Sequence, residues 1–166
     1  SSSAASDVYK RQVLYHAKVG EGAYRGSQPL KPLNDSNLRQ SIIGINPNWL
    51  TKPILGEIFK EIVNDSRSAR AYGSAALEIV SVATGNLEAY MTPRLQPWDF
   101  AGGLVILYEV NGQASNLLGE PLTISGPNSI LVGNRGLHQE ISNDYLEPHH
   151  DALIQLHEQR FKRKSK

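Results

Sequence analysis

The segment from Pro97 to Glu109 holds the side chains best suited to chemistry. Pro97 suits the start of a helix, and Asp99 then lies where free backbone amides and the positive end of the helix dipole favour a carboxylate. Gly102 and Gly103 follow, and each glycine inside a helix costs about 1 kcal/mol relative to alanine. This cost indicates close backbone packing or the close approach of a ligand. A buried helix with an aspartate cap is the alternative interpretation.

A second candidate site is Gly73-Ser74-Ala75, which precedes a predicted helix from Ser74 to Thr84. Backbone amides at the start of that helix could hold an anion or a hydroxyl without help from a side chain. An ordinary turn and a helix cap fit these residues equally well. The adjacent pair His149-His150 could indicate a metal site, but we interpret both histidines as exposed.

Predicted strands and helices alternate along the chain. These elements must position the candidate residues. A glycine turn, Gly20-Glu21-Gly22, separates two short predicted strands. Apolar or alternating runs predict further strands at 41–45, 69–73, 87–91 and 129–132. Helical spacing predicts helices near 54–62, 74–84, 97–110 and 137–145. In the second helix the expected inner face is Ala76, Leu77, Val80 and Ala83, and Gly85 suits its cap. This alternation predicts an α/β fold, a layered α-β-α sandwich.

The composition is that of an ordinary globular domain. Of 166 residues, 40% are apolar and 20% are charged, and the net charge of +1 gives no general reason to expect a nucleic acid or a membrane as partner. The absence of cysteine excludes disulfides, zinc thiolate sites and cysteine nucleophiles. No apolar run is long enough to span a bilayer and no signal peptide is visible, so a cytoplasmic protein is expected.

The first residues have an unusual character. When residues 2–12 are back-translated, they resemble a common transposase-type sequencing adaptor read in frame. This predicts that residues 1–12 are a non-native tail and that the native sequence begins at Val13, with its earlier part cut off. A flexible N-terminal tail is the plain alternative. We expect the end of an N-terminal sheet region at 13–40, a C-terminal α/β domain at 41–146 and a solvated basic tail at 147–166.

Four segments together resemble a known family. Trp98-Asp99-Phe100-Ala101-Gly102-Gly103, with Glu109 after it, resembles the second signature of the inositol monophosphatase family, in its bacterial inositol-1-monophosphatase type. Three other segments are similar to the family in the same order: Gly20–Tyr24, Arg70–Leu77 and Gly85–Tyr90. The resemblance implies the C-terminal part of the sugar-phosphatase fold.

The resemblance also implies a function. It indicates a magnesium-dependent phosphomonoesterase that hydrolyses inositol 1-phosphate or a related sugar phosphate, and that is a homodimer when intact. Asp99 is implied as a magnesium ligand, and Gly73, Ser74, Ala75 and Thr92 as substrate-binding residues. Thr92 stands where animal members carry a glutamate for the inositol hydroxyls, so inositol preference is open. The alternatives are a relative that acts on fructose 1,6-bisphosphate, NADP or adenosine bisphosphate, and a non-catalytic protein that binds RNA or transcription machinery.

The implied site is incomplete in this sequence. The family's first signature, Asp-Pro-Ile/Leu-Asp-Gly-Thr, supplies most of the metal ligands, and no Asp-Pro occurs in the chain. The main catalytic residues are therefore expected in a missing N-terminal part. We expect this fragment to be inactive, to bind magnesium weakly and to expose apolar surface.

Overall fold

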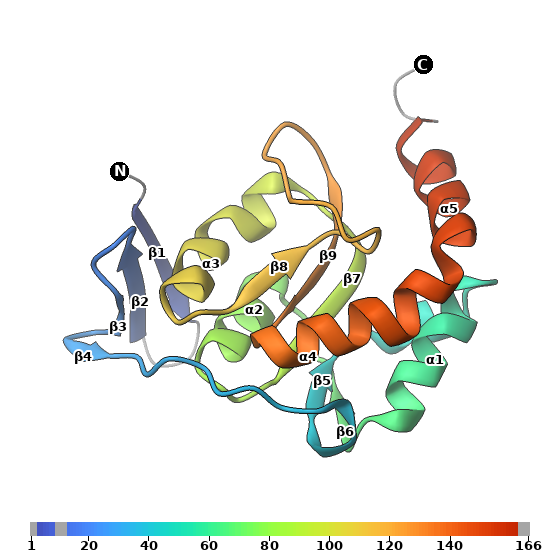
Figure 1. Ribbon diagram of the computed structural model, residues 1–166. Coiled ribbons are helices and arrows are strands. Elements are labelled where there is room, and N and C mark those ends of the chain that lie inside the picture. Colours follow the sequence, from blue (N-terminus) through green and yellow to red (C-terminus); the bar gives the residue numbers. More distant parts are fainter. Residues whose placement is uncertain (1–2, 9–12, 163–166) are drawn as a thin grey trace.

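The computed structural model describes residues 3–8 and 13–162, which form two sheets and the helices around them (Figure 1). Within that part of the chain, the larger sheet has the strand order β6-β5-β7-β9-β8. Its strands are β5 (Ile42–Gly44), β6 (Ser68–Arg70), β7 (Ala89–Leu95), β8 (Gln113–Ser115) and β9 (Asn128–Gly133). β5 is parallel to both β6 and β7, whereas β9 is antiparallel to β7 and β8.

Helices cover both faces of this sheet, as Figure 1 shows. α2 (Ala75–Ala83) and α3 (Pro97–Glu109) pack on one face. α1 (Leu55–Asp65), α4 (Arg135–Glu140) and α5 (His150–Lys162) lie on the other. The predicted α-β-α sandwich is therefore confirmed. Among the described residues, no helix is both long and apolar enough to cross a bilayer.

The side-chain alternation of the central strands explains the two buried layers. Successive residues of a strand point to opposite faces of a sheet. In β7, Tyr90 joins the core under α2 and α3, while Met91 joins the core under α1 and α4. In β9, Val132 and Leu131 divide in the same way. Because both faces are covered, every residue of β9 is buried.

A smaller antiparallel sheet packs against α3. Its strands, in order, are β1 (Ser3–Val8), β2 (Val13–Lys18), β3 (Ala23–Arg25) and β4 (Gln28–Pro29). The predicted glycine turn lies between β2 and β3, and its Gly20 and Gly22 have φ values of 81° and 85°. The Glu109 carboxylate at the end of α3 accepts the N–H groups of Gly20 at 3.2 Å and Gly22 at 2.8 Å. This pair of hydrogen bonds joins the small sheet to α3.

Both ends of the chain have more structure than the sequence predicted. Ser3–Val8 form β1, paired with β2, where we expected a tail. The adaptor origin of this segment stays a prediction, and residues 1–2 and 9–12 lie outside the described residues. The expected tail at 147–166 is helical through Lys162, because Leu153 of α5 packs into the core and is only 4% exposed. Residues 163–166 also lie outside the described part.

The inner face predicted for α2 was partly wrong. Ala76 is exposed, whereas Glu78, Ile79 and Val82 are buried. The reason is that α2 packs against both the sheet and α3, so its buried face is wider than the single stripe that periodicity predicts. The C-terminal end was predicted correctly, because Gly85 follows α2 with a φ of 81°.

The two adjacent glycines of α3 have different environments. A Cβ on Gly103 would lie 2.7 Å from Cγ2 of Ile79 in α2, closer than van der Waals contact allows. A Cβ on Gly102 would meet nothing within 4 Å. Close helix packing therefore accounts for Gly103, and the absence of a side chain there lets α2 and α3 approach each other.

This contrast predicts opposite effects of two matched substitutions. Gly103→Ala should destabilise the chain by about 1–3 kcal/mol, because α2 must shift to admit the methyl group. Gly102→Ala should stabilise it by about 0.5–1 kcal/mol through helix propensity. Urea denaturation of both variants measures the difference. Equal effects of the two substitutions would contradict the packing explanation.

Candidate active site

Chain topology brings the predicted site residues to one edge of the larger sheet. β6, β5 and β7 are parallel neighbours, so their carboxyl ends lie at the same edge. Gly73 follows the end of β6, and Asp99 follows the end of β7. Thr92 lies within β7 and is 5% exposed. Ligands of open α/β sheets commonly bind outside the carboxyl ends of the parallel strands.

Asp99 lies in the first turn of α3, as the sequence predicted. Its Oδ2 accepts the backbone N–H of Gln96 at 3.1 Å, and its own N–H donates to the Gln96 carbonyl at 2.9 Å. This capping arrangement fixes the aspartate at the positive end of a 13-residue helix. The cap interpretation is therefore correct, and the half-buried carboxylate keeps its other oxygen for a further partner.

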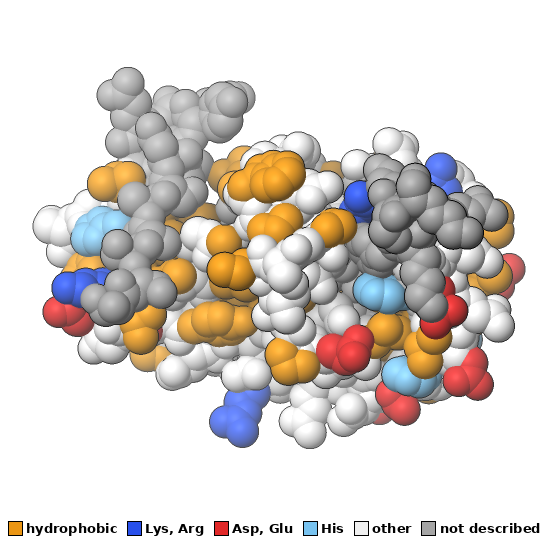
Figure 2. Space-filling model, turned by 90° about the horizontal axis from the view of Figure 1, so that it is seen from above, with side chains coloured by type: hydrophobic (Ala, Val, Ile, Leu, Met, Phe, Trp, Pro, Cys, Tyr) orange, Lys and Arg blue, Asp and Glu red, His pale blue; other side chains and the backbone are white. Residues whose placement is uncertain are grey.

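Two large apolar side chains are strongly exposed, and one of them directly precedes Asp99 in the chain. Trp98 is 79% exposed, and Ile124 is 77% exposed. Figure 2 shows hydrophobic side chains gathered across the middle of the molecule as seen from above. Large apolar side chains exposed in this way commonly mark surfaces that other parts of a protein cover.

The segment Gly73-Ser74-Ala75 forms the turn and cap that precede α2. Gly73 is exposed and has a φ of 81°, a left-handed conformation that favours glycine. The Ser74 hydroxyl accepts the Leu77 N–H at 3.3 Å, which makes Ser74 the N-cap. Ala75 is then the first helical residue. The ordinary cap interpretation holds here too, and it is compatible with amides that face a ligand.

Two buried residues that the sequence did not single out connect these positions. The Glu78 carboxylate accepts the N–H of Tyr72, just before the Gly73 turn, at 3.2 Å. Burial raises the pKa of Tyr90 well above its ordinary value, and the negative charges of Glu78 and Asp99 raise it further. A hydrogen bond with the Thr92 side chain opposes that rise. Tyr90 therefore lies among groups from α2, β7 and α3.

The sequence contains a pattern that could have identified Glu78 as an unusual residue. It is the one charged residue in the apolar helix 75–83, and a buried carboxylate there is unusual. Gly44, at the end of β5, leaves room for it, since a Cβ there would lie 3.3 Å from Oε1 of Glu78 and 3.2 Å from Cδ1 of Tyr90. Tyr90 carried no such signal, because a tyrosine in a central strand is ordinary.

A metal would find few ligands among these residues. The described residues contain no group of three histidines, aspartates or glutamates that could hold a metal ion. Asp99 offers one hard oxygen ligand of the kind that magnesium prefers. Glu78 accepts a backbone N–H and is 5% exposed. The residues present therefore do not form a metal site by themselves.

The burial of Glu78 predicts a pH-dependent stability. Burial raises its pKa, while the Tyr72 N–H opposes the rise. Between the unfolded and folded pKa values the folded chain binds more protons, so the free energy of unfolding falls as the pH rises through that window. Glu78→Gln keeps the acceptor but removes the charge. It should be more stable than wild type at pH 7 by on the order of 1 kcal/mol.

Urea denaturation at two pH values checks this prediction. The advantage of Glu78→Gln should shrink toward pH 4, near the ordinary pKa of a free glutamate. Glu61→Gln, on the exposed side of α1, is the matched control and should change little at either pH. A stability difference that is the same at both pH values would mean that the Glu78 charge is not its source.

The site geometry and the comparisons with known proteins indicate the same protein family. Helix starts that follow a glycine turn at the carboxyl edge of parallel strands are places where α/β proteins commonly bind small ligands. A family model described as the inositol monophosphatase family matches residues 6–151. The chain therefore belongs to the inositol monophosphatase family.

Individual relatives are similar over most of this chain. The inositol-1-monophosphatase of Bacillus subtilis is 42% identical over 135 residues, which are 80% of this chain and 51% of that protein. Two solved structures of the staphylococcal enzyme SaIMPase-II, one with inositol monophosphate and one with 2'AMP, are each 99% identical with a TM-score of 0.90. They cover 90% of this chain and 59% and 58% of the solved chains. The chain thus spans little more than half the length of these relatives.

Proposed function

We propose that the intact protein to which this chain belongs is a magnesium-dependent phosphomonoesterase that acts on inositol 1-phosphate or a related sugar phosphate. The observation that carries this proposal is the position of Asp99, in the first turn of α3 at the same sheet edge as the Gly73 turn. The 42% identity to a B. subtilis inositol-1-monophosphatase supports it. Bound magnesium would supply electrophilic activation of a phosphate ester.

The residues divide into two roles in this proposal. Asp99 is a magnesium ligand, since its carboxylate is held at a fixed position by the cap with Gln96. Gly73, Ser74 and Ala75 line the substrate side, where the exposed turn lets a hydroxyl or phosphate oxygen approach the backbone. Thr92 lies on β7, and its side chain hydrogen-bonds the buried Tyr90.

Substrate choice is the finer part of the proposal. Thr92 is short and uncharged, so it does not supply the carboxylate that binds inositol hydroxyls in animal relatives. The 2'AMP complex of SaIMPase-II supports a site that also admits a nucleotide phosphate. We therefore propose inositol 1-phosphate and nucleoside 2'-phosphates as the first substrates to compare. A homodimeric state and a cytoplasmic location remain predictions.

The alternative role in binding RNA or transcription machinery has little described support. The basic residues near the C-terminus were the only feature of the sequence that favoured this alternative. Of these, 163–166 lie outside the described residues. The phosphatase proposal depends instead on the position of Asp99 and on the 42% identity to the B. subtilis inositol-1-monophosphatase.

The chain by itself should lack phosphatase activity. One carboxylate does not hold the magnesium that the reaction needs, and no three-ligand group exists in the described part. Phosphate release from inositol 1-phosphate in magnesium should therefore stay at background for this chain, while an intact family member serves as the positive control. Release at a comparable rate would overturn the prediction.

Substitution of Asp99 in the intact protein tests its role. Asp99→Asn can still accept the Gln96 N–H, so the helix cap and the fold should survive. Loss of the charged ligand should lower magnesium-dependent phosphate release on the order of 100-fold, since a metal contributes several kcal/mol of charge stabilisation. Asp144→Asn, an exposed acid on the opposite side of the sheet, is the control. Equal rates for both variants would exclude Asp99 as a ligand.

A further inference from the structure

A polar cavity lies on the face of the larger sheet opposite to α2 and α3. It has a volume of about 310 Å³ and lies between the turn after β8 and the helical segment from α4 onward. Its polar lining includes Gln113, Arg135, His138, Gln139, Ser142 and Asn143. This volume is at the lower end of the range for small-molecule sites.

Several polar groups of this cavity have no partner within the described part of the chain. The Ser142 hydroxyl is buried there and makes no hydrogen bond. Such a group destabilises the folded state when it stays unsatisfied. The Arg135, Gln139 and Asn143 side chains are exposed at the cavity and make no side-chain hydrogen bond or ion pair to a described residue. The cavity thus presents donors and acceptors that the protein does not use.

One wall of the cavity is a π-helix, Ile141–Leu146, which carries Ser142 and Asn143. π-helical turns are rare and occur frequently at functional sites. This turn is held in place, because Ile141 and Leu146 are buried and the Tyr145 hydroxyl donates to Asp65 of α1 at 2.6 Å. A wall fixed in this way can present the Ser142 hydroxyl at a constant position.

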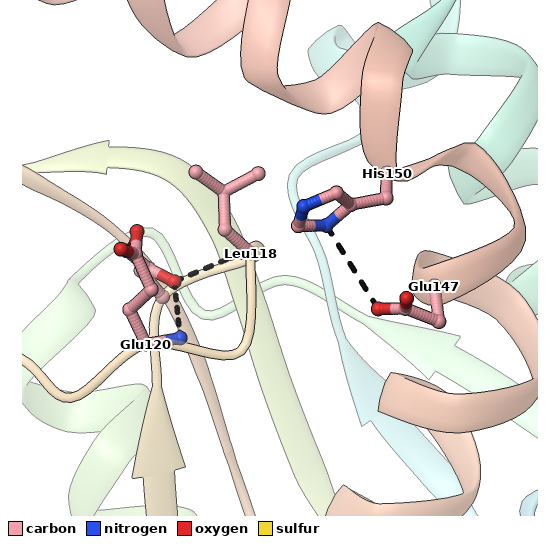
Figure 3. Close-up of polar contacts among 5 residues, drawn as sticks. Leu118, Glu120, Glu147 and His150 are labelled. Atoms are coloured by element: carbon pink, nitrogen blue, oxygen red, sulfur yellow. Dashed lines mark hydrogen bonds and ion pairs between the residues drawn. The ribbon is translucent and has the colours of Figure 1, made fainter.

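The charged groups around the cavity bear on the sign of the charge that a ligand would carry. His138 Nε2 lies 2.9 Å from the Ser115 hydroxyl, and burial lowers the pKa of His138, so the ring is neutral near pH 7. The Glu147 carboxylate, which also lines the cavity, lies 3.8 Å from Nδ1 of His150, and both residues lie across from Leu118 (Figure 3). Arg135 is therefore the cation of the cavity lining, and Glu147, whose side chain is 70% exposed, is its carboxylate.

The opposite wall is also well defined. The Asn116 side-chain oxygen accepts the N–H groups of Leu118 at 2.9 Å and Glu120 at 2.8 Å, which fixes the turn (Figure 3). Leu117 and Leu118 give this wall an apolar part. A ligand would thus meet an apolar surface on one side and amide and hydroxyl groups on the other.

We propose that this cavity binds a small organic anion with several hydroxyl groups, whose anionic group pairs with Arg135 and whose hydroxyl groups bond Ser142, Asn143 and Gln139. The guanidinium suits a carboxylate and a phosphate ester equally, so the shared chemistry is a hydroxylated anion. This site is separate from the Asp99 edge, because α4 and the π-helix lie on the other face of the sheet. It does not depend on the phosphatase proposal.

Titration of the chain with two probes tests the site. D-gluconate and glycerol 3-phosphate, each added without magnesium, represent the carboxylate and the phosphate ester. Amide NMR shifts should cluster at residues 113–119 and 135–147 with millimolar or tighter affinity for at least one probe. Binding of gluconate alone or of glycerol 3-phosphate alone identifies the anion and supports the site.

Two variants and a control separate binding from folding. Arg135→Gln should weaken binding about tenfold or more, as expected for loss of a charge-assisted contact. Ser142→Ala should weaken it several-fold while thermal stability stays equal or rises, because a buried unsatisfied hydroxyl is removed. Arg25→Gln, an exposed arginine on β3 of the small sheet and outside the cavity lining, should leave binding unchanged.

Three results would overturn the proposal. The first is no shift for either probe, the second is shifts centred on residues 73–75 and 99, and the third is equal affinity in Arg135→Gln and wild type.

Discussion

The close approach of α2 and α3 is the contact on which the site depends. Gly103 lets Ile79 of α2 lie against the backbone of α3, and both helices then cover one face of the parallel strands. Each helix begins just after a strand at the carboxyl edge, so the distance between the two helices sets how near Asp99 is to the Gly73 turn.

A buried polar cluster lies at the base of that edge. Glu78 and Tyr90 are both 5% exposed; burial raises the pKa of the Tyr90 phenol, and the Glu78 carboxylate raises it further. Burial of a carboxylate among apolar residues costs stability, and the Tyr72 N–H offsets part of this cost. The same hydrogen bond ties the chain before Gly73 to α2. The cluster thus lowers the stability of the fold while it fixes the Gly73 turn, as polar groups near functional sites often do.

The two faces of the sheet are organised differently. On one face Glu109 ties the small sheet to α3, and the Asp99 edge borders apolar surface around Trp98. On the other face, Tyr145 and Asp65 hold the π-helix against α1, and the polar groups point into a cavity. One face therefore suits contact with more protein, and the other suits a small ligand.

The sequence by itself determined the layered fold class, the turn at Gly20–Gly22, the start of α3 at Pro97 and the position of Asp99 in its first turn. These features depend on local backbone preferences and on periodicity, which neighbouring residues carry. The exposure of Ala76, the burial of Glu78 and the helix at 150–162 were decided by tertiary structure. They depend on which surfaces meet: α2 has two neighbours, and Leu153 finds a core formed by segments far away in the chain. Gly103 shows the difference. The sequence shows that a glycine here lowers helix propensity, whereas only folding brings Ile79, the side chain that requires the glycine, against this position.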